Sequence, residues 1–147
     1  MGKVATYDED IVLWAERQAE VLRSLSGRPG VPDELDIENV AGKIETVGRT
    51  EIRAAESPVR LIFVHLLKAT SVPYAPARTH WKAEVANWHY DLLGALTPSM
   101  RQRIDIDRVW RRAQREAALS LEAEGTALAD DLPQGAPVSL EELAAEE

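Results

Sequence analysis

The stretch from Ser57 to Thr70 reads SPVRLIFVHLLKAT and is apolar around most of a helical circumference. Its first two residues form a helix-start signal, because a serine hydroxyl can cap the first turn and proline fits a position whose N–H has no helical partner. At 100° per residue, one broad face holds Val59, Ile62, Phe63, Leu66 and Leu67. A helix this apolar is typical of a domain interior, whereas a surface helix keeps one polar side. The stretch therefore predicts an all-α fold built around a buried central helix.

Length and composition agree with one soluble domain. A chain of 147 residues is close to the usual single-domain size. It has no cysteine, which excludes disulfides, thiolate metal sites and cysteine nucleophiles. The apolar stretch is too short and too charged to span a membrane, and the first 14 residues hold no apolar run of signal-peptide length. We therefore expect a cytoplasmic protein without a membrane partner.

The net charge of −8 belongs to one end of the chain. From Glu116 onward there are nine acidic residues and no basic one, so residues 1–115 carry a net charge of +1. An acidic end disfavours nucleic acid near itself and leaves other surfaces open to it.

Helical periodicity and capping signals predict a compact bundle of about five main helices and an acidic tail. The predicted segments are 6–25, starting at a Thr6–Glu9 capping box; 33–55, capped by Asp33 or Asp36; 57–70; 81–96; and 97–125, ending at Gly125. A last short helix follows a Ser139–Glu142 capping box. We expect residues 1–125 to form a single domain, on which the tail of residues 126–147 docks. Continuity of the second and central helices across Ser57-Pro58 is left open.

Several short motifs together resemble bacterial domain-of-unknown-function family 29. They are Tyr7-Asp8-Glu9-Asp10 with Trp14, Glu34 to Asn39, Glu45 to Arg49, His65-Leu66-Leu67-Lys68, Trp81, and the end from Leu132 to Leu143. The resemblance covers nearly the whole chain and implies a small, all-helical bacterial protein. It implies no activity, since none is known for that family.

One candidate site combines the polar edge of the second helix with the less apolar side of the central one. Glu45 and Arg49 share a column beside the apolar face, and His65 and Lys68 face the same way three residues apart. If these two helices pack antiparallel, the four side chains can form a ligand-binding or acid/base cluster. We favour ion pairs that satisfy polar groups at a helix boundary, because paired groups are as often structural as catalytic.

A second candidate site is an arginine-rich helix face. Four side chains span about 100° of one helix and could contact phosphate: Arg108, Arg111, Arg112 and Arg115. We favour a solvated face, partly neutralised by the i,i+4 pairs Asp107–Arg111 and Arg112–Glu116. The face lacks interleaved exposed aromatic residues and a recognition-helix signature, so a nucleic-acid partner is not favoured, although it is not excluded.

The remaining signals are weak. Four tryptophans, Trp14, Trp81, Trp88 and Trp110, lie in apolar stripes and are expected in the core. No histidine has the Glu-x-x-His or His-Glu-x-x-His context of a metal site, and nucleotide-binding and hydrolase motifs are missing, so we expect no metal and no cofactor. The leading hypothesis is a non-enzymatic protein-interaction module that contacts a protein partner through the acidic tail or an apolar groove, and the oligomeric state is left open. The alternatives are a small-ligand binder or enzyme using Glu45, Arg49, His65 and Lys68, and a nucleic-acid binder using the arginine face.

Overall fold

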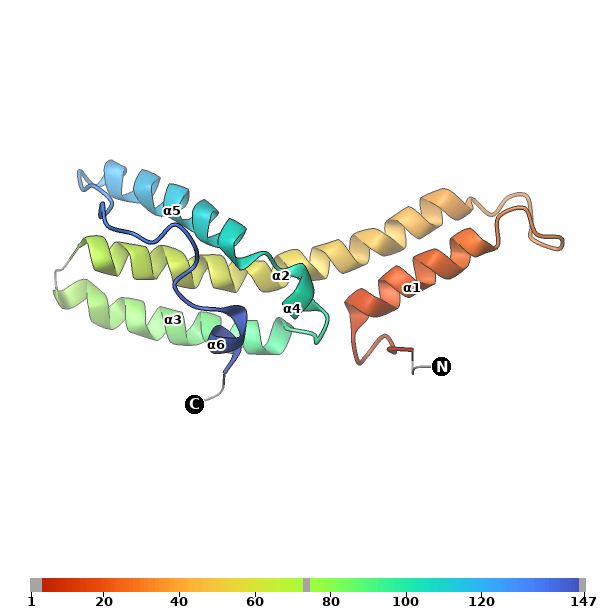
Figure 1. The fold of residues 1–147 in the computed structure, drawn as a ribbon, viewed down its shortest axis with the longest axis horizontal. Coiled ribbons are helices and arrows are strands. Elements are labelled where there is room, and N and C mark those ends of the chain that lie inside the picture. Colours follow the sequence, from red (N-terminus) through yellow and green to blue (C-terminus); the bar gives the residue numbers. More distant parts are fainter. Residues whose placement is uncertain (1–3, 73–74, 146–147) are drawn as a thin grey trace. The chain divides into compact units, whose positions relative to one another are not determined.

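The computed structural model describes residues 4–72 and 75–145, with the side chains of 75–81 left out (Figure 1). The described residues form α-helices and no strand, which confirms the all-α prediction. The helices are α1 (Ile11–Ser24), α2 (Ile37–Ser71), α3 (Ala75–Ala95), α4 (Met100–Arg103), α5 (Ile106–Ala123) and α6 (Leu140–Ala144).

The chain divides into two compact units. The N-terminal unit is Met1–Arg53 with Thr97–Arg103, and the C-terminal unit is Ala54–Leu96 with Ile104–Glu147. The dividing line falls inside α2 and differs from the boundary at residue 125 that we expected between domain and tail. The tail belongs to the C-terminal unit.

The N-terminal unit contains a hairpin of α1 and the first half of α2, joined by a glycine- and proline-rich loop at residues 25–36, and it also contains α4. Asp10 is the N-cap of α1 and accepts a hydrogen bond from the Leu13 N–H at 3.2 Å. The predicted start at Thr6 is therefore wrong: its hydroxyl accepts from the Glu9 N–H at 3.3 Å in a turn that precedes the helix. Of the two caps proposed for the second helix, Asp36 accepts from the Asn39 N–H at 3.3 Å.

Small side chains let the two helices of the hairpin approach closely. Ala15, Ala19 and Ala41 are fully buried. A Cβ placed on Gly48 would lie 3.6 Å from the Cβ of Ala15, so a side chain there would meet α1 directly. The core of this unit is consequently narrow.

The second and central helices of the prediction are one continuous helix, α2, with Pro58 inside it. A proline in a helix interior removes one backbone hydrogen bond and costs about 3 kcal/mol. Ala55, Pro58 and Val59 are all buried at this point. The packing of these residues outweighs the helix-start signal that Ser57-Pro58 carries locally.

The C-terminal unit has a core of large side chains from the second half of α2, from α3 and from α5. Val59, Ile62, Phe63, Val64 and Leu67 are buried, and the Phe63 and Trp110 rings meet edge to face with centroids 5.1 Å apart. Leu66, expected in this core, is 43% exposed. A helical wheel shows in which direction a side chain points, but it does not show how far the neighbouring elements extend along the helix. Leu66 points to the same side as the buried Ile62 but lies one turn further along α2.

The predicted helix 97–125 is interrupted. It forms α4 and α5, because Asp105 takes the N-cap position of α5 and accepts from the Arg108 N–H at 3.1 Å. Its predicted end is confirmed, since Gly125 has a φ of +77°.

The tail is fastened to the C-terminal unit by hydrogen bonds along its length. The Ser71 hydroxyl accepts from the Ala129 N–H at 3.0 Å, and His89 Nε2 lies 2.7 Å from the Leu143 carbonyl oxygen. The predicted capping box of α6 is also confirmed, because Ser139 accepts from the Glu142 N–H at 3.1 Å.

Candidate functional site

The four residues of the first candidate cluster do not come from two antiparallel helices. All lie on α2, where sixteen positions, more than four turns, separate Arg49 from His65. Glu45 and Arg49 fall in the N-terminal unit, whereas His65 and Lys68 fall in the C-terminal unit. Because α2 is one continuous helix, these residues do not face one another across two antiparallel helices.

Glu45 has a partner that the sequence analysis did not identify. Its carboxylate accepts a hydrogen bond from Arg23 of α1 at 2.5 Å, and this bond lowers the pKa of the Glu45 carboxyl. Glu38 accepts from the same guanidinium at 3.1 Å, and the two carboxylates raise the pKa of Arg23. Arg49 is exposed and donates to the Thr46 hydroxyl at 2.9 Å. These contacts hold one edge of the hairpin together.

His65 packs against α3. Its Nδ1–H donates to the Leu61 carbonyl oxygen at 3.1 Å, and Nε2 lies 3.5 Å from a carboxylate oxygen of Glu84. Its ring meets that of Trp88 with centroids 4.4 Å apart. Glu84 was not among the predicted site residues, although a short connection between two helices makes them antiparallel neighbours and brings residues on either side of the turn together.

No metal site emerges from the side chains that the structure describes. Among them, no group of three or more histidine, aspartate or glutamate residues is placed to hold a metal ion. In addition, none of the described helices combines the length and apolar character needed to cross a membrane.

The acidic partners expected for the α5 arginines are engaged elsewhere. Asp107 accepts a hydrogen bond from the Ala136 N–H at 2.9 Å, and Glu116 pairs with Arg60 of α2. The predicted Asp107–Arg111 and Arg112–Glu116 pairs therefore do not form. Arg108 alone among the four has an ion pair with a described residue, Glu56 at 2.9 Å. The exposed side chains of Arg111, Arg112 and Arg115 have none within residues 4–72 and 75–145.

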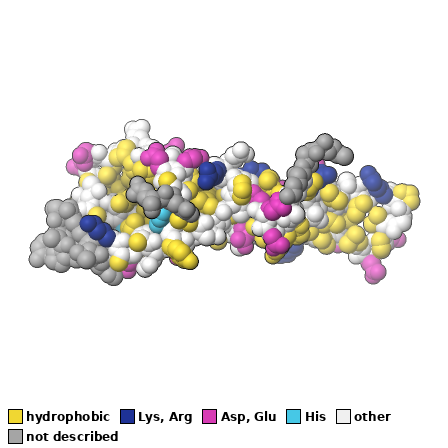
Figure 2. Space-filling model, turned by 90° about the horizontal axis from the view of Figure 1, so that it is seen from below, with side chains coloured by type: hydrophobic (Ala, Val, Ile, Leu, Met, Phe, Trp, Pro, Cys, Tyr) yellow, Lys and Arg dark blue, Asp and Glu magenta, His cyan; other side chains and the backbone are white. Residues whose placement is uncertain are grey.

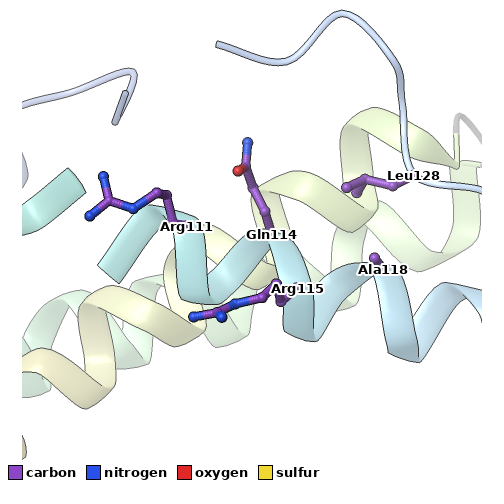
Figure 3. A pocket seen from close by; sticks show the side chains of 5 residues that line it. All are labelled: Arg111, Gln114, Arg115, Ala118 and Leu128. Carbon is purple, nitrogen blue, oxygen red and sulfur yellow. The ribbon is translucent and has the colours of Figure 1, made fainter. Parts of the chain in front are cut away.

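A shallow groove runs between α5 and the tail (Figure 3). It has a volume of about 490 Å³ and is lined by Arg111, Gln114, Arg115, Ala118 and Leu128. The tail side is held in place because the Pro133 carbonyl oxygen accepts from Trp110 Nε1 at 2.9 Å and from Gln114 at 3.3 Å. Arg112 does not line the groove, although it lies next to Arg111 in the chain.

The hairpin has one polar edge and one apolar face. The Arg23 contacts with Glu38 and Glu45 mark the polar edge. The opposite side of both helices at 100° per residue is apolar, and we call it the hairpin face: Trp14, Val21, Leu25, Val40, Ile44 and Val47. Its three valines are each 38–39% exposed, and its other members are half-buried.

The expectation of four core tryptophans holds only in part. Trp110 is buried, whereas Trp14 and Trp88 are half-buried. The side chain of Trp81 lies outside the described residues.

Comparison with known proteins identifies the family. The model of the domain of unknown function DUF29 matches residues 6–147. The chain belongs to the DUF29 family. A solved structure of an alpha-helical protein of unknown function from Rhodospirillum rubrum ATCC 11170 is 42% identical to this DUF29 chain, with a TM-score of 0.86. The similarity covers 99% of this chain and 92% of that one. No curated protein matches the chain.

Proposed function

We propose that this DUF29 chain is a non-enzymatic protein-interaction module whose contact surface is the hairpin face. The observation that carries the proposal is the exposure of three valines of the hairpin face, Val21, Val40 and Val47, each 38–39% exposed. Figure 2 also shows hydrophobic side chains gathered over the N-terminal unit. Exposed apolar side chains that gather on one surface mark interaction sites on soluble proteins.

The occupant we propose is the same face of a second copy. Besides its two hairpin helices the N-terminal unit has only the short α4, and stable helical domains bury their apolar stripes against further helices. Two hairpins in contact through this face would form a four-helix arrangement, and twofold pairing of one surface with itself is the commonest route to an oligomer. A second copy is also the one partner present wherever the chain is made.

The size of the face sets the expected affinity. With 14 residues, α1 is about 21 Å long, and two helices side by side span about 20 Å. Pairing two such faces buries roughly 800 Å² in total, which is at the small end of specific interfaces. We therefore expect a weak dimer that dissociates on dilution.

The geometry gives less support to the enzyme or small-ligand alternative. Glu45 is engaged with Arg23, and the other half of the cluster lies more than four turns away along α2. A catalytic site needs its groups held together around a reacting atom.

The experiment is sedimentation of the full chain over a range of concentrations. We expect a monomer–dimer equilibrium that Val21→Glu with Val47→Glu shifts to monomer, because each glutamate would be buried without a partner. Leu13→Glu is the matched control: Leu13 is also exposed, at 38%, but lies outside the hairpin face, so this variant should still dimerise.

Circular dichroism would verify that each variant remains helical. A wild-type chain that is monomeric at every concentration would overturn the proposal. Equal loss of dimer in the Leu13→Glu variant would also overturn it.

A further inference from the structure

We propose that the groove between α5 and the tail binds an organic phosphate. In this assignment Arg111 and Arg115 hold the phosphate group, and the apolar body of the ligand lies against Ala118 and Leu128. This site is independent of the hairpin face, because all its residues belong to the C-terminal unit.

The groove carries positive charge that no acidic side chain neutralises among the described residues. The protein carries a net charge of −8, yet two arginines one helical turn apart lack an ion pair among the described residues. Their nearest acidic residues in sequence are committed to other partners, Asp107 to the Ala136 N–H and Glu116 to Arg60. An anion arriving in the groove therefore need not displace an existing ion pair.

Charged and apolar side chains lie at different ends of the groove. In Figure 3 the guanidinium groups of Arg111 and Arg115 extend away from Leu128, so a cationic end and an apolar end are separated. The planar guanidinium fork suits phosphate oxygens, which it can bind through two hydrogen bonds. A ligand with one phosphate and a short apolar body matches both ends.

Hydrogen bonds within the protein hold the tail wall of the groove in place. Its tail wall is anchored at Ala129 by Ser71 and at Pro133 by Trp110. The groove is shallow, with a volume of about 490 Å³, so a ligand would lie against it rather than be enclosed. Binding at a preformed wall avoids the entropic cost of ordering a loop.

The tail also carries a feature that must weaken binding. Asp130 and Asp131 are exposed and follow Leu128 and Ala129 in the wall segment. Their negative charges oppose an incoming phosphate, and Asp130→Asn with Asp131→Asn should therefore tighten it.

The test is an NMR titration of the full chain with phenyl phosphate. Separate titrations with inorganic phosphate and with phenol measure the binding of its charged part and of its apolar part. We expect saturable shifts of amides in residues 111–118 and 128, with phenyl phosphate binding more tightly than either half. Arg111→Ala and Arg115→Ala should each weaken phenyl phosphate about tenfold, the loss expected for one charge-assisted hydrogen-bonded contact. Leu128→Ala should weaken phenyl phosphate and leave inorganic phosphate unchanged.

Arg112→Ala is the matched control, because it removes the same charge from the same helix outside the groove. It should leave phenyl phosphate binding unchanged. Weakening equal to that of Arg111→Ala would show only a general effect of charge and would overturn the proposal, as would the lack of a saturable shift. Tighter binding of a single-stranded oligonucleotide, weakened equally by replacing any of the four α5 arginines, would assign the face to nucleic acid instead.

Discussion

The interiors of the two units of this DUF29 chain are packed with side chains of different size. The N-terminal unit buries three alanines, Ala15, Ala19 and Ala41, with Val12 and Met100 as its larger fully buried side chains, and it leaves the three valines of the hairpin face exposed. The C-terminal unit is packed through Phe63, Trp110 and Leu121, which are buried on at least two different helices. Since stabilisation scales with buried apolar area, we expect the C-terminal unit to hold most of the stability of the chain. The hairpin face is the surface that we propose a partner covers.

The largest expected effect is at the centre of the better-packed unit. Phe63→Ala removes a fully buried ring that meets Trp110 edge to face, and it should cost about 3–5 kcal/mol of unfolding free energy. Chemical denaturation would measure the loss. A cost below about 1 kcal/mol would mean that the C-terminal unit does not depend on this core.

Two neighbouring leucines sharpen the comparison inside α2. Leu67 is 1% exposed and Leu66 is 43% exposed. Leu67→Ala should cost about 2–5 kcal/mol, whereas Leu66→Ala should cost less than about 1 kcal/mol, because little apolar area is lost from the interior. Thermal melts of the two variants would measure this difference, and each variant is the control for the other. Equal losses would show that Leu66 is covered in solution.

The N-terminal unit relies on a buried polar contact. Asp10 is 3% exposed, and Ser99 donates to it from its N–H and its hydroxyl, both at 2.8 Å. Asp10→Ala should cost about 1.5–3 kcal/mol, the range for hydrogen bonds to a charged group. Hydrogen exchange would locate the loss in α1 and the first half of α2. Uniform loss across both units would contradict a separate hairpin.

The same carboxylate makes stability depend on pH. Burial by itself raises the pKa of Asp10, but the hydrogen bonds from Ser99 and Leu13 outweigh it and leave the pKa below its ordinary value of 3.8. A carboxyl with a lowered folded-state pKa stabilises the fold above its unfolded pKa and loses that contribution as the pH falls through the folded value. The stability difference between the wild type and Asp10→Ala should therefore shrink below about pH 4. A difference that stays constant down to pH 2 would contradict the lowered pKa.

The smallest expected effect is at the polar edge of the hairpin. Arg23→Ala removes the contacts with Glu38 and Glu45 on a solvent-exposed edge, so the melting temperature should fall slightly and less so in high salt. A fall as large as that of Asp10→Ala would show that this edge, rather than the buried polar contact, holds the hairpin together.

The sequence predicts the charged side chains of the candidate sites better than it predicts their partners. It identified the arginines of α5 by their spacing, but it assigned Asp107 and Glu116 to them as i,i+4 partners. In the structure these carboxyls interact with the tail and with α2, which lie far away in sequence. A local rule weighs only neighbours within one helix, so it could not anticipate that longer-range contacts would free Arg111 and Arg115.

The helical class, the glycine end of α5 and the capping box of α6 could be predicted from the sequence, because periodicity, a positive φ and capping hydrogen bonds are local properties. The continuation of α2 through Pro58, the exposure of Leu66 and the pairing of Glu45 with Arg23 could not be predicted in this way. Each of these depends on which surface covers a residue. That is set by packing between distant segments, which can outweigh a local preference of about 3 kcal/mol.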